Sequence, residues 1–175
     1  MRKSRADAAR TRRNIVDAAA RLFRARGIDG VSVADIMGSL GLTVGGFYKH
    51  FEGKDALVAE AIERASLQSA AASGSPAELL AGYLSMAHRN DLGRGCPVAA
   101  LCSEVAHQGR STRKAFGVAV RRLFDRIQSV GLPRSQALAV GAQIVGALVL
   151  SRAISDDKLA REILAAAASS IELRA

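Results

Sequence analysis

Residues 32–51 have the sequence Ser-Val-Ala-Asp-Ile-Met-Gly-Ser-Leu-Gly-Leu-Thr-Val-Gly-Gly-Phe-Tyr-Lys-His-Phe. Ser32 is a favourable helix N-cap, and the apolar residues that follow it recur at helical spacing. Gly41 interrupts this pattern, and Thr43 can cap a second helix that runs to about Phe51. Two short helices that meet at a glycine are the layout of a helix-turn-helix.

The sequence before this pair predicts a longer helix that braces it. Thr11 can cap that helix, residues 15–23 carry apolar side chains at helical spacing, and Gly27 can end it. Residues 1–10 form a basic arm without an apolar pattern. A break at Gly53 then precedes the next predicted helix.

This N-terminal third of the chain resembles the TetR family of transcriptional regulators. The resemblance is carried by Ile15-Val-Asp-Ala-Ala, Leu22-Phe23, Gly27, Ser32-Val-Ala-Asp-Ile36, Gly41-Leu-Thr-Val-Gly-Gly-Phe-Tyr-Lys-His-Phe51 and Lys54-Asp-Ala-Leu57. It implies a homodimer that binds a palindromic operator in double-stranded DNA, usually as a repressor that a small-molecule effector releases. It also implies a DNA-binding head at residues 1–53 and an effector-binding and dimerisation body at residues 54–175.

The remaining sequence predicts an all-α fold with about nine helices in total. Alanine and leucine dominate, and no stretch alternates between apolar and polar residues as a half-buried strand does. Residues 72–76 contain glycine, serine and proline and predict a linker. The body is therefore expected to be a helical bundle behind the three-helix head.

The charge distribution favours a polyanionic partner. The net charge is +9, and residues 1–54 carry eleven Lys and Arg against five Asp and Glu. A basic surplus of this kind attracts nucleic acid or an acidic membrane. A basic helical adaptor for RNA or an acidic membrane therefore stays an alternative, although it leaves the Tyr48-Lys49-His50 cluster unexplained.

The second short helix carries the side chains that we expect to contact DNA. Thr43, Val44 and Lys49 can reach base edges, whereas Gly45 and Gly46 let the backbone approach closely. Because these glycines remove two base-reading side chains, DNA deformability should supply part of the specificity. Helix starts attract phosphate, and by similarity a tyrosine and a histidine donate to it. The predicted DNA-binding residues are Thr11, Arg12, Ser32, Val33, Thr43, Val44, Gly45, Gly46, Tyr48, Lys49, His50 and Lys54.

The most apolar predicted helix lies near residues 134–154. Its residues 137–150 are apolar on nearly every side, and such a helix needs burial on nearly every side. Packing this helix and the one near residues 157–172 against their two-fold mates would form a four-helix dimer interface, and burial within one chain is the alternative. The run is shorter than a membrane span and contains Gln143, so we expect no membrane insertion. Without an apolar signal segment, a cytoplasmic protein is expected.

The resemblance places an effector pocket in the body. The candidate lining residues are Tyr83, Met86, His88, Cys96, Cys102, Phe116 and Gln143. Cys96 stands at a predicted helix start beside Arg94, and both features favour a thiolate, so a redox or electrophile sensor acting through Cys96 stays an alternative. We expect Cys102 to be buried and inert.

Other classes of function find no support in the sequence. The cysteines and histidines fit no standard zinc spacing, so no metal and no cofactor are predicted. There is no glycine-rich phosphate loop, no GxSxG motif and no credible pair of catalytic carboxylates. An enzyme is therefore not expected.

Overall fold

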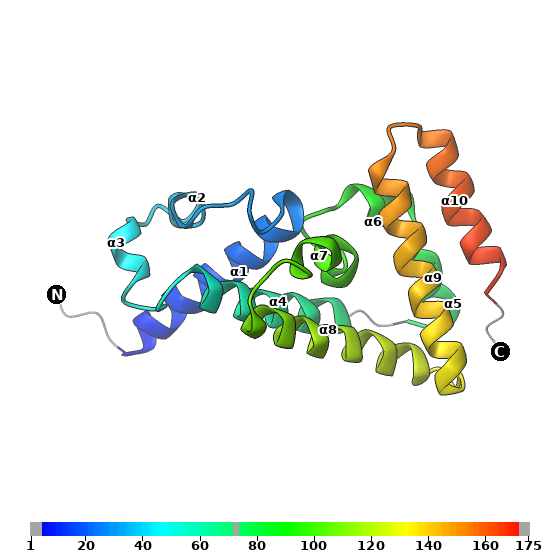
Figure 1. The fold of residues 1–175 in the computed structure, drawn as a ribbon, viewed down its shortest axis with the longest axis horizontal. Coiled ribbons are helices and arrows are strands. Elements are labelled where there is room, and N and C mark those ends of the chain that lie inside the picture. Colours follow the sequence, from blue (N-terminus) through cyan, green and yellow to red (C-terminus); the bar gives the residue numbers. More distant parts are fainter. Residues whose placement is uncertain (1–4, 72–73, 172–175) are drawn as a thin grey trace.

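The structure is a computed structural model that describes residues 5–71 and 74–171. These residues form ten helices and no strand, which confirms the predicted all-α fold (Figure 1). The helices are α1 (Arg5–Arg26), α2 (Val33–Gly38), α3 (Val44–Phe47), α4 (Lys54–Ala70), α5 (Pro76–Tyr83), α6 (Met86–Asn90), α7 (Pro97–Val105), α8 (Arg110–Gln128), α9 (Arg134–Ala153) and α10 (Asp157–Ser169). Part of the predicted basic arm (1–4), part of the predicted linker (72–73) and the last residue of the helix expected near 157–172 lie outside the described residues.

The helix count exceeds the predicted nine because the segment after Pro76 forms two helices. Helix α5 begins with a capping box in which Ser75 and Glu78 bond to each other's backbone N–H. The chain then leaves the helical conformation at Leu84, and the Ser85 hydroxyl accepts a hydrogen bond from the first turn of α6. A second capping serine therefore starts a new helix within one expected element.

Helix α1 begins earlier than predicted, and Thr11 is not its cap. The helix starts at Arg5, and the Thr11 hydroxyl donates to the Asp7 carbonyl oxygen one turn before it, at 2.9 Å. The predicted end is confirmed, because Gly27 has a φ of +80°. That left-handed conformation favours glycine and terminates the helix.

Helices α2 and α3 form the turn motif at one end of the molecule. Ser32 caps α2 through a capping box with Asp35, as its position predicted. Helix α3 is shorter than expected, since only Val44–Phe47 is α-helical and the next three residues form turns. Thr43 occupies the N-cap position, but its hydroxyl makes no capping hydrogen bond.

Two apolar cores hold the molecule together. The larger core continues from the α1–α3 head into α4, α7 and α8, and Phe47 is fully buried in it. The smaller core joins α5 and α6 to α9 and α10. Figure 1 shows α9 and α10 side by side at the end of the molecule opposite α2 and α3.

A hydrogen bond from α7 fixes the head to the body. The Glu104 carboxylate accepts the Ile28 backbone N–H at 2.7 Å, just after α1 ends. A Cβ at Gly27 would lie 2.6 Å from the same carboxylate, so a side chain at this position would displace Glu104. The turn after α1 is thereby tied to a helix of the body.

Helix α9 has the length and composition of a membrane span, although its described contacts are those of a packed helix. It has 20 residues, and its 18-residue window has a mean hydropathy of 1.4 with 33% of the window buried. It packs against α8 on one side and α10 on another. Core helices of soluble proteins pass the same two criteria, so this feature is weak evidence for a membrane.

Candidate nucleic-acid interface and ligand cavity

The outer face of α3 is exposed, whereas its inner face is anchored in the core. Phe47 is 0% exposed and stacks on Phe51 with ring centroids 5.3 Å apart. On the other side, Val44 is 42% exposed and Tyr48 is 65% exposed. Helix α3 therefore buries Phe47 in the core and exposes the side chains on its opposite face to solvent.

The predicted DNA-binding residues fall into two groups by exposure. The exposed group consists of Ser32, Thr43, Val44, Gly45, Tyr48 and Lys49. The half-buried group consists of Thr11, Arg12, Val33, Gly46, His50 and Lys54. The exposed group comes almost entirely from the segment that contains α3, which forms a continuous outer surface of the head.

Ser32 is already engaged inside the head. Its hydroxyl donates to the Asp35 carboxylate at 2.6 Å and accepts the Asp35 backbone N–H at 3.1 Å. The same carboxylate accepts the Ser32 backbone N–H at 2.8 Å. These hydrogen bonds from Ser32 stabilise the charged carboxylate and lower the pKa of Asp35.

Arg12 also has a structural role. Its guanidinium forms a two-pronged ion pair with Glu60 of α4 and lies over the Phe51 ring, 4.4 Å from its centroid. The hydrogen bond to Glu60 raises the pKa of Arg12. This side chain therefore joins α1 to α4 beside the turn motif.

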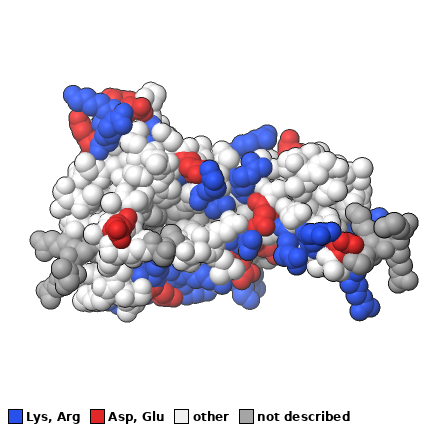
Figure 2. Space-filling view, turned by 180° about the vertical axis from the view of Figure 1, so that it is seen from behind, with Lys and Arg blue, Asp and Glu red and all other residues white. Residues whose placement is uncertain are grey.

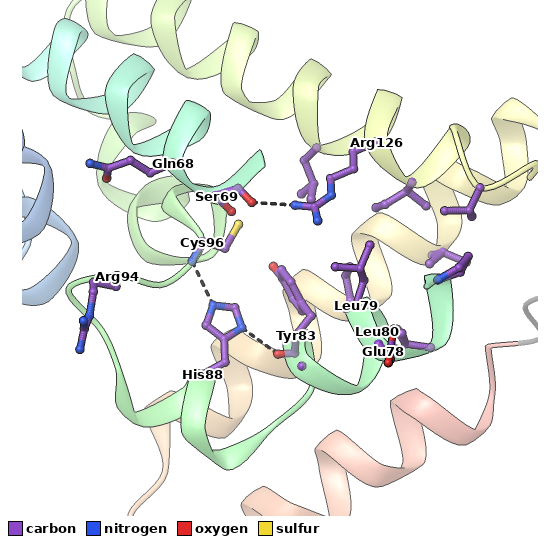
Figure 3. A pocket seen from close by; sticks show the side chains of 17 residues that line it. Gln68, Ser69, Glu78, Leu79, Leu80, Tyr83, His88, Arg94, Cys96 and Arg126 are labelled. Carbon is purple, nitrogen blue, oxygen red and sulfur yellow. Dashed lines mark hydrogen bonds between the residues drawn. The ribbon is translucent and has the colours of Figure 1, made fainter. Parts of the chain in front are cut away.

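A cavity of about 480 Å³ lies in the body between α4, α5, α8 and α9 (Figure 3). Its walls are mainly leucine, isoleucine and valine side chains, and the start of α7 closes one end. The lining residues are Gln68, Ser69, Pro76, Glu78, Leu79, Leu80, Gly82, Tyr83, His88, Arg94, Cys96, Leu123, Arg126, Ile127, Val130, Val140 and Ile144. The volume is typical of sites that take small molecules.

Three of the seven predicted pocket residues line this cavity, namely Tyr83, His88 and Cys96. The other four lie elsewhere. Met86 packs in the smaller core, and Phe116 packs against the larger one. Gln143 is exposed and donates to the Ser170 hydroxyl, and Cys102 is exposed on α7.

The Tyr83, His88 and Cys96 side chains meet at the inner end of the cavity. The His88 ring bridges two backbone groups, because Nδ1 lies 2.8 Å from the Tyr83 carbonyl oxygen and Nε2 accepts the Cys96 N–H at 3.0 Å. These partners assign the proton of the neutral ring to Nδ1. Burial lowers the pKa of His88. Burial also raises the pKa of Tyr83, whose hydroxyl has no hydrogen-bond partner in the described part of the chain.

The surroundings of the two cysteines differ from the prediction. Cys96 stands at the N-cap of α7, as expected, but it is only 3% exposed. Arg94 is turned to solvent and pairs with Asp91. The prediction that Cys102 is buried was wrong, because the buried face of α7 is formed by its Val98, Leu101 and Val105 and leaves Cys102 outside.

Sequence reasoning also missed the arginines around this end of the cavity. Arg24 is 6% exposed, and its guanidinium donates to Gly95 O at 3.1 Å and to Gln68 Oε1 at 3.1 Å. The sequence did contain an indication that Arg24 is buried. It is a charged residue on the apolar side of α1, four positions after the buried Ala20. On α8, the spacing of Leu123, Ile127 and Val130 indicated an apolar stripe but not that it faces a cavity.

The described residues contain no group of three or more His, Cys, Asp or Glu side chains that could hold a metal ion. The polar end of the cavity is instead a set of hydrogen-bond donors and positive charges. This arrangement can bind and orient a ligand.

Comparisons with known proteins agree with this architecture. Residues 15–61 match the family described as bacterial regulatory proteins, tetR family. Over 59 residues the chain is 39% identical to the HTH-type transcriptional regulator AcrR of Shigella flexneri, which covers 34% of this chain and 27% of that protein. The match therefore spans about a quarter of the relative's length.

Solved structures share the whole fold. A TetR-family transcriptional regulator from Agrobacterium tumefaciens has a TM-score of 0.76 at 21% identity, over 94% of this chain and 98% of its own. A TetR transcriptional regulator from Chloroflexus aurantiacus has a TM-score of 0.73 at 24% identity, over 94% and 95%. The reduced form of NemR from E. coli has a TM-score of 0.70 at 20% identity, over 91% and 94%. The helix-turn-helix segment therefore matches the tetR family of bacterial regulatory proteins in sequence, and the whole chain shares the fold of solved TetR-family regulators.

Proposed function

We propose that this protein is a ligand-responsive repressor that binds a palindromic DNA operator as a homodimer in the cytoplasm. The observation that carries this proposal is the exposed outer face of α3, which is anchored from behind by the buried Phe47. A helix held in this way can enter the major groove without losing its own core contacts. The match of residues 15–61 to the tetR family supports a regulator and not an enzyme.

The α3 surface offers both base-reading and phosphate-binding groups. Thr43, Val44 and Lys49 face solvent on the side that would meet base edges. Tyr48 can donate its hydroxyl to a phosphate, and Lys54 begins α4, where free backbone N–H groups attract the same ligand. The Ser32 hydroxyl and backbone N–H are both bonded to Asp35, and Arg12 is paired with Glu60, so we expect these two residues to contribute less to DNA binding.

The α9–α10 hairpin supplies a surface for a second copy. Leu138 and Leu150 on α9 are 40% and 59% exposed, and Leu159 on α10 is 43% exposed. Between the two α9 leucines, a Cβ built at Gly146 would meet nothing within 4 Å, so another helix can approach there. Figure 2 shows few charged side chains over much of this end of the molecule. A two-fold pair through this surface would set two α3 helices on one face, about 34 Å apart or near that spacing on B-DNA.

Helix α4 connects the cavity to the head. Its first residue, Lys54, adjoins the turn motif, and Gln68 and Ser69 near its last turn line the cavity. A 17-residue helix spans about 25 Å at ~1.5 Å per residue. A ligand that changes the position of the α4 end would therefore move the head. Such a ligand would change the affinity for DNA only to the extent that it binds one position of the head more tightly than the other.

The proposal is tested by selecting bound fragments from a random pool of double-stranded DNA. We expect a palindromic consensus, whereas enrichment of no sequence, or equal retention of single-stranded RNA, would contradict the proposal. The selected site then allows a test of α3. Lys49→Gln should lower the slope of log affinity against log salt by about 1.8 for the dimer, because the two-fold complex loses one phosphate-neutralising cation from each copy, each worth about 0.9. Lys114→Gln on the exposed surface of α8 is the matched control and should leave the slope unchanged.

A thiol-based sensor is a second candidate function, because Cys96 lines the cavity. A small electrophile that enters the cavity would reach its sulfur, whereas Cys102 lies on the outer surface. N-ethylmaleimide treatment of a Cys102→Ser variant tests this candidate by mass spectrometry. Addition of one maleimide together with loss of operator binding would support it, and an unmodified folded protein would contradict it.

A further inference from the structure

We infer that the cavity binds an amphipathic organic anion, with its charged group at the Tyr83 hydroxyl and its apolar part against α8 and α9. The inference rests on the proposed ligand-responsive function and adds the chemical class of the ligand. It comes from three features of the cavity, namely its apolar wall, an unsatisfied donor and an excess of positive charge.

The apolar wall accounts for most of the cavity surface. Leu123 and Ile127 of α8, Val140 and Ile144 of α9, and Leu79 of α5 all line it. A hydrocarbon or aromatic group in contact with these side chains would be removed from water, which is favourable in proportion to the apolar area buried. The wall therefore selects a ligand with an apolar body.

The Tyr83 hydroxyl is the unsatisfied donor. Its oxygen is buried beside the Cys96 thiol, which is only a weak acceptor, and by geometry it makes no hydrogen bond among the described residues. Figure 3 shows the hydroxyl turned toward the part of the cavity near Cys96 and Arg126. Buried polar groups normally have a partner, and leaving one without is unfavourable. A ligand oxygen at this position would supply the missing acceptor.

Further positive charge beside the cavity comes from the buried Arg24 and the half-buried Arg152, which form no ion pair among the described residues, although the Asp91 carboxylate lies near both. Arg24 donates to Ala20 O, Gly95 O and Gln68 Oε1, which are all neutral acceptors. Arg152 donates to Arg89 O and His88 O, and its Nη1 has no partner in the described part of the chain. Burial lowers the pKa of both arginines, which is the same desolvation that an adjacent anion would offset.

Arginines outnumber carboxylates among the described lining residues of the cavity. Arg94 and Arg126 line it, and the Arg126 guanidinium is held there by a 2.6 Å hydrogen bond to Ser69 O. Glu78 is the one carboxylate among the described lining residues, and its oxygen is used by Ser75 in the cap of α5. Because Arg94 is turned to solvent and paired with Asp91, an anion would gain attraction mainly from Arg24, Arg126 and Arg152, whereas a cation would be repelled.

Titration calorimetry with matched small molecules tests the ligand class. The probes are octanoate, octanamide and octylammonium, with naphthalene-2-carboxylate and its amide as an aromatic pair, all at pH 7.5. We expect each carboxylate to bind at least about tenfold more tightly than its amide, because hydrogen bonds to a charged group are the stronger ones. We expect octylammonium to bind most weakly. Amides that equal their carboxylates, or a preference for octylammonium, would overturn the inference.

The two tyrosines of the chain provide a matched pair of variants. Tyr83→Phe removes only the cavity hydroxyl and should weaken carboxylate binding about tenfold. It should leave affinity for the selected DNA site unchanged. Tyr48→Phe makes the same change on the exposed head, so it should weaken DNA binding and leave carboxylate affinity unchanged. Helical circular dichroism of both variants verifies their folds.

The outcomes separate this inference from the proposed function. A protein that binds the selected DNA but neither carboxylate overturns the anion inference and leaves the DNA-binding proposal standing. A protein that binds the carboxylates through Tyr83 but enriches no DNA sequence supports the ligand class and contradicts the proposed function. Carboxylate binding that Tyr83→Phe does not weaken would place the anion elsewhere and overturn the site.

Discussion

Replacement of Leu150 by alanine should weaken the association of two copies of this protein about 100-fold. Leu150 lies near the end of α9 with 59% of its surface exposed in the single chain. It belongs to the side of the hairpin that we propose to be covered by a two-fold mate. The exposed part of such a leucine makes no contact within the chain and would be buried in the proposed dimer.

The magnitude follows from the exposed fraction. Leucine to alanine removes three carbon groups, worth together ~2.4 kcal/mol when they are fully buried. Scaled to the 59% of Leu150 that the partner can cover, the loss is about 1.4 kcal/mol per copy. A two-fold interface contains the residue twice, so the dimer loses about 2.8 kcal/mol, and each 1.4 kcal/mol changes the dissociation constant tenfold.

Sedimentation velocity over a range of protein concentrations measures this change. Leu67→Ala is the matched control, because Leu67 is 48% exposed on α4, outside the α9–α10 hairpin. It should change the dissociation constant by less than about threefold. An unchanged constant for Leu150→Ala would refute the assignment of this surface, as would an equal effect of the control. Thermal unfolding of the diluted monomers should be similar for the wild type and both variants.

Three further predictions concern the head and its connection to the body. Glu104→Ala leaves the Ile28 N–H without its acceptor and should lower the free energy of unfolding by about 1–3 kcal/mol, measured by urea titration; a change below about 0.5 kcal/mol would show that water replaces the carboxylate. Asp35 has a pKa lowered by its hydrogen bonds from Ser32, so its contribution is complete above the unfolded-state value near 4 and is lost as the pH falls through the lower folded value. The thermal midpoint of Asp35→Asn should therefore differ from that of wild type at pH 7 and approach it near pH 2, and a pH-independent difference would contradict this reasoning. His88 has a pKa lowered by burial, so the unfolded chain binds its proton first and the wild type should lose stability as the pH falls below about 6.5. His88→Gln should remove that part of the pH dependence, and an unchanged stability profile between pH 5 and 7 would contradict the assignment.

The helix-turn-helix was predictable because its signals are local. The end of α1 at Gly27 and the cap of α2 at Ser32 depend on backbone conformation and on hydrogen bonds within a few residues. Phe47 and Phe51, which are four residues apart in the same short motif, are both buried. Local signals were weaker where several residues could start the same helix. The cap predicted at Thr11 is one example, because Thr11 lies inside α1.

The cavity was not predictable in the same way. Its lining comes from five helices and from the loop before α7, which are separated by long stretches of sequence. Met86 and Phe116 have the size and apolar character of lining residues, yet both pack in the cores. An apolar stripe in the sequence does not indicate whether its side chains pack against another helix or line a cavity.

By itself, the sequence determined where most helices begin and end, which residues form the turn motif and which family the chain resembles. Only the tertiary structure decided that Arg12 pairs with Glu60, that Cys96 is buried while Cys102 is exposed, and that Arg24 lies beside the cavity. The physical reason is the range of the interactions. Capping and periodicity act within a turn or two of helix, whereas burial and charge pairing depend on which distant surfaces come into contact.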